Sequence, residues 1–340
     1  MHRRPRAPKH SPVIKRSAPD VPVPPDCDPD SVVLRFPVPH ELDGQRLDRF
    51  VEWRIPRLSR IRAAQIVEAC ARRDDGSRRR PSDRVRSGEH VILVRERFVE
   101  PPTPMEFGVL YQDEAVTAVD KPAGLPVHPS ATYHRNTLTS LMRQRFGPEG
   151  PHLCHRLDRE TSGVVVCASR GPDEVAVKRQ FAGRGVEKEY LAIVRGLVSV
   201  DVQSVSLPMR RVTEGLHMKM EVHPDGLPAF TEVVVLEHRG AHTKVLLRPR
   251  TGRQHQLRVH LSAIGHPIVG DKLYGPDGGD SFLAWAEFGM TEQLLGRFGH
   301  HRHALHAHRC AIDHPRTGER LSFEAPLSAD LEALWASFEP

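Results

Sequence analysis

Residues 155–168 of the chain read HRLDRETSGVVVCA, a polar segment that runs directly into an apolar one. The apolar half predicts a buried strand, and the polar half predicts the tight turn that leads into it. Asp158 is a carboxylate of this turn and lies between the cations Arg156 and Arg159. Flanking positive charge keeps an acid ionised and fixes its direction, as a nucleophile or a general base requires. An Asp before a strand also commonly caps a turn through backbone hydrogen bonds, so the rest of the chain must decide.

The composition favours an intracellular protein with an anionic partner. The 340 residues leave room for two domains, and the formal net charge of +6 favours nucleic acid, although a solvated basic surface has the same charge. We find neither a stretch as long as a membrane span nor the apolar core of a secretory signal, and we therefore expect a cytoplasmic protein that does not bind membranes. The five cysteines are scattered, which predicts reduced thiols rather than a disulfide framework or a zinc site.

The first hundred residues divide into a tail and a small module. Residues 1–30 are rich in Pro, Arg and Lys, which predicts a disordered basic tail. Residues 31–97 begin with a strand-like alternation and continue with apolar residues at helical spacing. Ser59 is placed to cap a second helix that contains Ile61 and Val67. A short strand is expected at residues 91–94.

This module resembles the small RNA-binding module first seen in a ribosomal small-subunit protein. The resemblance is carried by GQRLDRF at residues 44–50 and LSR at residues 58–60. A basic run, RRDDGSRRR at residues 72–80, stands where the related modules have a glycine-containing hairpin. Such a run either contacts RNA or is a solvated loop.

The rest of the chain predicts a single larger domain. A proline-rich segment at residues 98–105 is a stiff linker, and residues 106–340 alternate between strand-like and helix-like patterns. Strands follow one another without regular crossover helices, which favours an α+β fold with a mixed, largely antiparallel sheet. The strands expected most clearly lie at residues 116–119, 190–194, 231–235 and 243–247. No glycine-rich phosphate loop is present, so we expect no nucleotide cofactor.

The polar turn at residues 155–163 resembles, over its whole length, the central motif of the RluA-type RNA pseudouridine synthases. Further segments are similar to the same family and stand in the same order. They lie at residues 121–129, 187–194, 250–261, 270–275 and 305–307. Together they cover roughly residues 107–327, and the order of five such segments is far more specific than any one of them.

The resemblance implies roles for particular residues. Asp158 corresponds to the catalytic carboxylate of the family, and Arg258 to the arginine that pairs with it. Tyr190 corresponds to the tyrosine that lies against the target base, although a strand tyrosine is more often a packing residue. Arg156 would fill the gap left by the extruded base. The other residues expected to bind substrate are His155, Thr161, Arg253, His255 and Gln256.

The implied activity is the isomerisation of uridine in RNA to pseudouridine. Large-subunit ribosomal RNA is the favoured substrate, and transfer RNA is used by relatives. Isomerisation needs no cofactor and no metal, and we expect a monomer. Asp158 would start the reaction by attacking the base or the sugar or by removing a sugar proton.

Three other interpretations remain open at this stage. A non-catalytic RNA-binding or ribosome-assembly protein could share the fold. A glycosidase would need a second acid near Asp158, and Glu160 is the nearest, although it is more often solvated or paired with Arg159. The histidines at residues 300–308 invite a metal site, but they lack an acidic or cysteine partner in the sequence, so we expect no functional metal.

Overall fold

The computed structural model describes residues 23–25, 27, 28, 31–55, 58–95, 100–130, 132–183, 185–213, 216, 218–277 and 279–339. It forms two compact units, one made of residues 1–101 and 129–135 and the other of residues 102–128 and 136–340. Most of the expected basic tail, and residues 98 and 99 of the expected linker, lie outside the described residues. Among the described helices, none combines the length and the apolar composition that crossing a bilayer requires.

The first unit is a three-stranded antiparallel sheet with two helices. The strand order is β1-β3-β2. Its core contains Phe50, Val51, Val67 and Val91, each fully buried. The elements are β1 (Val32–Pro37), a 3-10 helix (His40–Leu42), α1 (Leu47–Arg54), α2 (Arg60–Cys70), β2 (Ala71–Arg72) and β3 (His90–Arg95).

Helix α2 begins where its sequence predicts and buries a different face. The Ser59 side chain accepts a hydrogen bond from the Arg62 amide at 3.3 Å, as expected of an N-cap. Ile61, in contrast, is 75% exposed, because the buried face of the helix passes through Ala63 and Val67. The apolar spacing therefore predicts the helix correctly, but it places Ile61 among the buried apolar residues, whereas this side chain is exposed.

The basic run after α2 is partly used inside the unit. Arg72 and Arg79 are buried, and Arg79 pairs with Glu89 at 3.1 Å. Arg78 and Arg80 are exposed. Only part of this run is therefore available to a partner.

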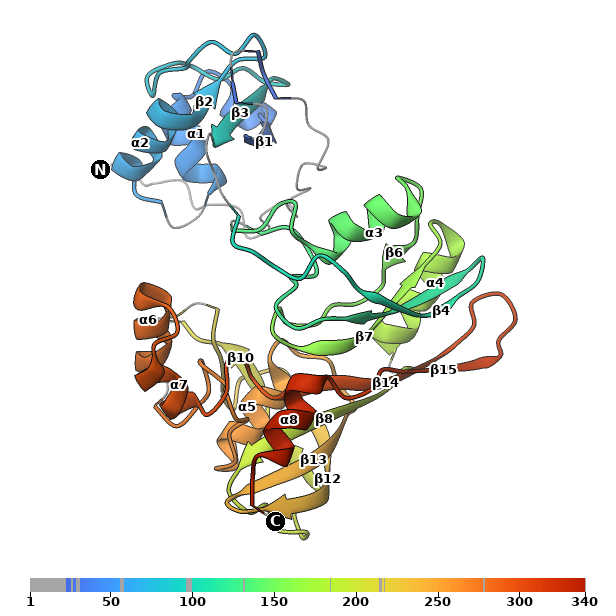
Figure 1. Ribbon diagram of the computed structural model, residues 1–340. Helices are drawn as coiled ribbons and strands as arrows, with labels where there is room; N and C mark the ends of the chain where they lie inside the picture. The colour runs from blue at the N-terminus through green and yellow to red at the C-terminus, as the bar shows by residue number, and fades with distance from the viewer. Residues whose placement is uncertain are drawn as a thin grey trace. The chain divides into compact units, whose positions relative to one another are not determined.

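The second unit is built on one ten-stranded mixed sheet (Figure 1). The order along its main path is β4-β5-β7-β14-β8-β13-β12-β9, with β15 paired to β14 and β6 to β7. The β7–β14 pair is parallel and the other described pairs of this sheet are antiparallel, so the expected mixed, largely antiparallel sheet is confirmed. The strands are β4 (Gly108–Gln112), β5 (Val116–Lys121), β6 (His152–Leu153), β7 (Ser162–Ala168), β8 (Glu187–Arg195), β9 (Ser204–Ser206), β12 (Phe230–Arg239), β13 (His242–Pro249), β14 (Leu305–Asp313) and β15 (Arg320–Glu324).

Helices α3 (Leu138–Phe146) and α4 (Pro172–Gly183) cover opposite faces of the sheet around β7. Val164 and Val166 pack with Val177 of α4. Val165, between them, packs with Leu141 of α3. Because alternate residues of a strand point to opposite faces, a strand covered on both faces is apolar throughout. This packing explains why the run after Gly163 shows no polar alternation.

Helices α5 (Gln256–Ala263) and α8 (Ala329–Ala336) cover the other half of the sheet, again from opposite faces. His260 of α5 contacts Thr231 Oγ1 at 3.0 Å. Trp335 of α8 donates to Glu237 Oε2 at 3.0 Å. A bulge in β12 between Val235 and Glu237 turns Glu237 to the face opposite Thr231. Each helix therefore finds a polar anchor on its own face.

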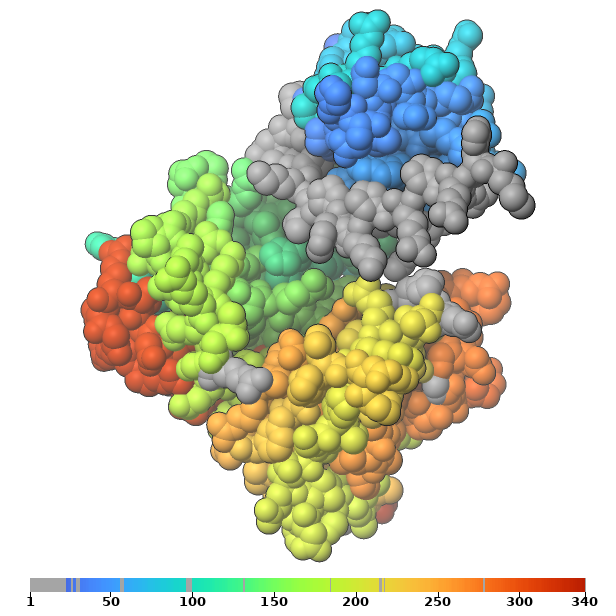
Figure 2. Space-filling view, turned by 180° about the vertical axis from the view of Figure 1, so that it is seen from behind, coloured from blue at the N-terminus to red at the C-terminus, as the bar shows by residue number. Residues whose placement is uncertain are grey.

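The second unit also contains a helical pair, α6 (Gly279–Phe288) and α7 (Glu292–Phe298), and a hairpin of β10 (Met209–Arg211) and β11 (Met220–Val222). The hairpin lies beside α6 and α7 in both views (Figures 1 and 2). Phe282 of α6 and Met220 of β11 pack against the same buried cluster, which includes Met209 and Leu273, so a shared apolar core holds the two segments together.

Strand β14 joins the two halves of the sheet. Its Ala307 is opposite Gly163 on one side and Tyr190 on the other. Gly163 has φ +108°, and a Cβ there would lie 2.2 Å from the Ala307 carbonyl oxygen. Only glycine permits this approach. The turn with Asp158 and the strand with Tyr190 are thereby brought within one strand of each other.

Candidate active site

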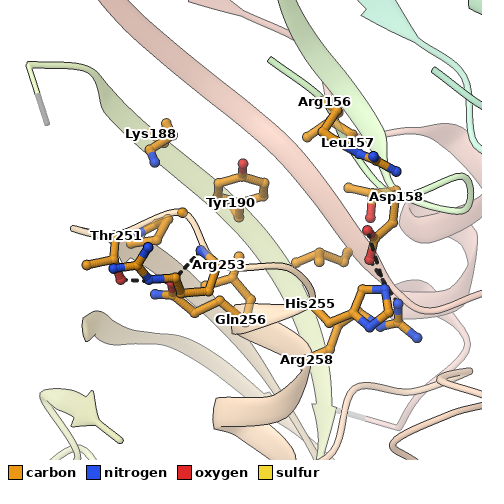
Figure 3. Close-up of a pocket in the computed structure, with 15 residues that line it drawn as sticks. Arg156, Leu157, Asp158, Lys188, Tyr190, Thr251, Arg253, His255, Gln256 and Arg258 are labelled. Carbon is orange, nitrogen blue, oxygen red and sulfur yellow. Dashed lines mark hydrogen bonds and ion pairs between the residues drawn. The ribbon is translucent and has the colours of Figure 1, made fainter. Parts of the chain in front are cut away.

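A cavity of about 100 Å³ opens where the turn before β7, strand β8 and the start of α5 meet. Its small volume suits one flat ring rather than an extended ligand, since drug-sized ligands occupy roughly 300 Å³ or more. Figure 3 shows Tyr190 across the cavity from Asp158. Eight of the nine expected site residues line it, namely Arg156, Asp158, Thr161, Tyr190, Arg253, His255, Gln256 and Arg258.

Asp158 is held as an anion with one oxygen available. Its Oδ2 accepts a hydrogen bond from Arg258 Nη1 at 2.8 Å. Its Oδ1 lies 3.8 Å from His255 Nε2 and accepts no hydrogen bond from the described residues. Burial alone would raise the pKa of Asp158, but the charge of Arg258 holds that pKa below its ordinary value. The carboxylate is therefore ionised at neutral pH and 26% exposed toward the cavity.

Arg258 is fixed from behind by a second carboxylate, Asp271. Arg258 Nε donates to Asp271 Oδ2 at 2.6 Å, and Nη2 donates to Oδ1 at 2.9 Å. Oδ1 also accepts from the amides of Leu273 and Tyr274 at 2.9 and 3.0 Å. Burial opposes ionisation of Asp271, yet Arg258 lowers the pKa of this side chain, which has no exposed surface. Because Nε and Nη2 are bonded to Asp271, the orientation of the guanidinium is fixed, and its Nη1 is directed at Asp158.

The backbone of the turn that carries Asp158 is held by hydrogen bonds to the carbonyls of the two residues that follow Asp158. Fully buried Lys121 donates to the Arg159 carbonyl oxygen at 3.1 Å, and also to the carbonyls of Pro122 and Leu125. Buried Arg302 donates to the Glu160 carbonyl oxygen at 3.0 Å. These bonds fix the backbone on which the carboxylate is mounted.

The side chain of Glu160 is an anchor as well. It accepts bonds from Lys272 Nζ at 2.8 and 2.9 Å and from Arg159 at 3.2 Å. Burial would raise the pKa of Glu160, but His303, Lys272 and Arg159 lower it. A glycosidase needs its second acid protonated, and Glu160 is instead an ionised partner of two cations.

The segment 270–275 supplies these supports because its first residue permits a close approach. Gly270 has φ +78°, and a Cβ there would lie 1.9 Å from the Arg302 carbonyl oxygen. Glycine is required for both reasons. The next two residues, Asp271 and Lys272, then point to Arg258 and Glu160. The chemical role of this segment is thus to hold the active-site charges in place.

Tyr190 lies in β8 with its ring partly buried between two apolar clusters. Burial raises the pKa of its hydroxyl, so the side chain stays neutral. The hydroxyl makes no hydrogen bond within the described part of the chain. A neutral aromatic face and a free hydroxyl are therefore presented to the cavity.

His255 has the single positive φ of a non-glycine residue in the described chain, +56°. Its Nδ1 lies 2.8 Å from the Tyr274 hydroxyl, which itself accepts a bond from the Met220 amide. This contact is compatible with the tautomer in which Tyr274 donates to Nδ1 and the histidine proton lies on Nε2, which faces Asp158. Burial lowers the pKa of His255 although Asp158 opposes this, so the imidazole is neutral.

Three expected substrate contacts are engaged elsewhere. His155 does not line the cavity: its Nε2 accepts from the Val166 amide at 2.9 Å, its ring stacks on Phe181, and burial lowers its pKa to about 3. Both ends of the Gln256 side-chain amide are hydrogen-bonded. The oxygen accepts from Thr251 and Arg253, and the nitrogen donates to Phe230 and Thr231. Thr161 contacts His303 Nε2 at 2.7 Å. Of these three, only His155 lies outside the cavity lining, whereas Thr161 and Gln256 line the cavity with their polar atoms already bonded within the protein.

The histidines at residues 300–308 have protein partners. His303 contacts Thr161, and His306 contacts Ser162 Oγ at 2.9 Å. His308 Nδ1 lies 2.9 Å from the Ala325 carbonyl oxygen. In the described residues, no group of three or more His, Cys, Asp or Glu side chains is arranged to hold a metal ion.

Sequence reasoning missed two residues that the site depends on. Asp271 was part of a recognised segment, but the sequence does not show that its carboxylate grips Arg258. Lys121 looked like part of a Lys-Pro turn, and a buried lysine bonded to three carbonyls is visible only in the fold. The signal for Asp271 in the sequence is an acidic residue between a glycine and Lys272, directly after the apolar pair at residues 268–269.

Comparison with known proteins places this geometry in a family. Residues 115–263 match the model of the RNA pseudouridylate synthases. The chain is 34% identical over 91% of its length to ribosomal large subunit pseudouridine synthase D of Xanthomonas campestris, covering 93% of that protein. It is 36% identical over 90% of its length to the protein of the same name from Pseudomonas aeruginosa, covering 95% of it.

Solved structures agree. Human RNA pseudouridylate synthase domain containing 1 superposes with a TM-score of 0.56 at 32% identity, over 71% of this chain and 91% of the human one. Human RNA pseudouridylate synthase domain containing 4 gives 0.53 at 30% identity, over 67% of this chain and 92% of that one. The chain belongs to the RluA-type RNA pseudouridine synthase family. It is accordingly an enzyme of RNA modification, an RNA pseudouridine synthase, and the expectation from its motifs is confirmed.

Proposed function

We propose that this enzyme isomerises uridines in large-subunit ribosomal RNA and that Asp158 is its catalytic carboxylate. The observation that carries the proposal is the chain of contacts Asp158–Arg258–Asp271, which keeps Asp158 ionised and leaves its Oδ1 free at the cavity. In the reaction the bond from N1 of the base to C1′ of the sugar breaks and a bond from C5 to C1′ forms. N1 gains a proton and C5 loses one, so atoms balance without a co-reactant.

The free oxygen of Asp158 is the group that initiates this exchange. Oδ2 is occupied by Arg258, and therefore Oδ1 is the oxygen that attacks the substrate or takes a proton from it. Arg258 prevents protonation of the carboxylate and, being fixed by Asp271, does so without moving. Neutral His255 lies beside Oδ1 and so limits the directions from which a substrate can approach this oxygen.

Tyr190 and the exposed cation Arg156 complete the reacting pocket. The ring of Tyr190 forms a stacking face for the uracil, and its unbonded hydroxyl is available to carry the proton that leaves C5. Arg156 lies at the open side of the cavity, where it can fill the space that the extruded nucleotide vacates. Extrusion from a paired stem costs a few kcal/mol, which phosphate contacts offset.

The choice of ribosomal RNA rests on the names of the relatives from Xanthomonas campestris and Pseudomonas aeruginosa. The module at residues 31–97, with exposed Arg78 and Arg80, is assigned an RNA-binding role beside the catalytic domain at residues 106–340. We expect the enzyme to act as a monomer in the cytoplasm, where ribosomal RNA is made and modified.

The test is pseudouridine mapping of total RNA from cells with and without the gene. Loss of sites in large-subunit ribosomal RNA, restored by the wild-type chain and not by Asp158→Asn, is the expected result. Loss of sites in transfer RNA alone would refute the proposed substrate and leave the enzyme class standing. Restoration by Asp158→Asn would refute the catalytic role of Asp158.

A further inference from the structure

The cavity contains more positive charge than the reaction at Asp158 uses. Four of its lining side chains are cationic, namely Arg156, Lys188, Arg253 and Arg258, and one is a carboxylate, Asp158. Arg258 is balanced by Asp158 and Asp271. The remaining three cations have no carboxylate partner among the described residues, which is an arrangement that attracts an anion.

Lys188 is the most unusual of the three. It lies two positions before Tyr190 in β8, so both side chains are on the same face of the sheet. Its ammonium makes no hydrogen bond and no ion pair with the described residues. Burial lowers its pKa, which means that the site bears a cost for keeping this group charged. By contrast, Lys121 and Lys272 in the same region each have oxygen partners at 3.1 Å or less.

The ammonium of Lys188 lies close to the turn at residues 251–253. A Cβ built on Gly252 would lie 3.7 Å from Lys188 Nζ, which is van der Waals contact, so the glycine lets the backbone of the turn approach the ammonium. Figure 3 shows Lys188 and Arg253 on one side of Tyr190, with Asp158 and Arg258 on the other. Arg253 is steered by its Nε bond to the Pro228 carbonyl at 3.3 Å and by the contact of its amide with Gln256.

We propose that Lys188 and Arg253 form a subsite for a backbone phosphate next to the target uridine. The subsite rests on the proposed function, because it assumes that Tyr190 stacks on the base and that Asp158 reacts near the sugar. The phosphates of such a nucleotide are attached to the sugar near Asp158, and Lys188 and Arg253 line the same cavity as Asp158 and Tyr190. A phosphodiester carries one negative charge and offers oxygens that lysine and arginine bind well. The phosphate fixes the register of the strand, so the uridine enters the cavity in one orientation.

The test is a binding cycle in the Asp158→Asn background, where turnover does not disturb the measurement. The probe is a synthetic RNA hairpin with one loop uridine, made with phosphates or with neutral methylphosphonates on either side of that uridine. The variant is Lys188→Gln, and Lys188→Arg is the conservative replacement. The matched control is Lys244→Gln, since Lys244 lies on neighbouring β13, faces the other side of the sheet and is already paired with Glu237 at 3.2 Å.

We expect Lys188→Gln to weaken binding by about fivefold at 0.1 M salt and to reduce the slope of log K against log salt by ~0.7, the value for one phosphate contact with a single strand. Neutral linkages should weaken binding to the parent and leave the affinity of Lys188→Gln unchanged. Lys188→Arg should restore most of the affinity, and Lys244→Gln should match the parent.

Two results would overturn the subsite. Equal penalties for the neutral linkages in the parent and in Lys188→Gln would show that Lys188 does not meet a phosphate. A loss of kcat in an otherwise wild-type Lys188→Gln chain, with Kd and salt slope unchanged, would place the ammonium in the chemistry instead. Failure of the proposed function is recognised separately, because the wild-type chain would then neither isomerise the hairpin uridine nor bind it in a salt-dependent way.

Discussion

Replacement of Asp271 by Asn should damage both stability and turnover, although Asp271 is not among the residues that line the cavity with Asp158. The carboxylate has no exposed surface and accepts four bonds, three at Oδ1 and one at Oδ2. An Asn can keep the bonds at Oδ1, but its NH₂ then faces Arg258 Nε, donor against donor. Arg258 is left buried with half of its counter-charge. Breaking a buried pair in this way costs about 3–5 kcal/mol.

That loss is large enough to measure directly. In a unit of this size it corresponds to a fall in Tm of ~6–20 °C. Turnover should fall by at least ~100-fold at a temperature where the variant is still folded, since a guanidinium free to turn no longer holds Asp158 and a misplacement of about 1 Å has that effect. The assays are thermal unfolding by circular dichroism and release of tritium from RNA that contains [5-³H]uridine.

The matched control is Asp173→Asn. Asp173 also receives a forked arginine, Arg316, at 2.9 and 3.2 Å, but that arginine is at the surface. Surface pairs contribute about 0–1 kcal/mol, so this variant should melt and turn over like the wild type. If Asp271→Asn also kept wild-type Tm and turnover, the reasoning about the support of Arg258 would be wrong.

Four further results follow from the structure. Tyr190→Phe should keep the fold and lose most of its turnover in the tritium-release assay, and wild-type rates would return Tyr190 to a packing role. Lys121→Met should lower the unfolding free energy in urea by roughly 2–5 kcal/mol, because three buried carbonyls lose their donor; a neutral effect would contradict this. Gly163→Ala should fail to give folded protein by circular dichroism, whereas Gly171→Ala, at a site with open space, should fold with a small loss from its positive φ. Arg258 lowers the pKa of Asp271 in the folded protein against the effect of burial. The stability that this pair contributes is therefore fully present above the pKa of an unfolded Asp and is lost as the pH falls through the lower pKa of the folded state. The difference in unfolding free energy between wild type and Asp271→Asn should accordingly be constant above about pH 5 and shrink below pH ~4.

The sequence predicts the fold well where the pattern is local. The apolar run after Gly163, the cap at Ser59 and the strands near Val116 and Tyr190 each follow from the residues themselves. The sequence predicts less reliably which face of a helix is buried. Ile61 is exposed because the approach of α1 to α2 decides which side of the helix is covered, and no spacing rule contains that information.

The sequence predicts the main residues that line the cavity, but it does not predict the buried residues that hold them in place. Asp158, Tyr190 and Arg258 were named from motifs, and the structure brings them to one cavity. His155 and Gln256 belong to the same motifs and are expected to bind substrate, yet their polar atoms are bonded to the backbone and to neighbouring side chains. Asp271 was not named, since burial and direction arise only when residues more than ten positions apart are packed together.

Strand β14 has a consequence for how the enzyme is made. It supplies residues 305–313 from late in the chain, yet it lies between β7 and β8 in the middle of the sheet. On the ribosome, a nascent chain that has already exposed Asp158 and Tyr190 must hold two unpaired strand edges until β14 emerges. A prematurely terminated product ending before residue 305 therefore lacks the connection between the two catalytic halves. Such a fragment is expected to be inactive and prone to aggregate, so RNA modification by this enzyme requires translation to proceed beyond β14.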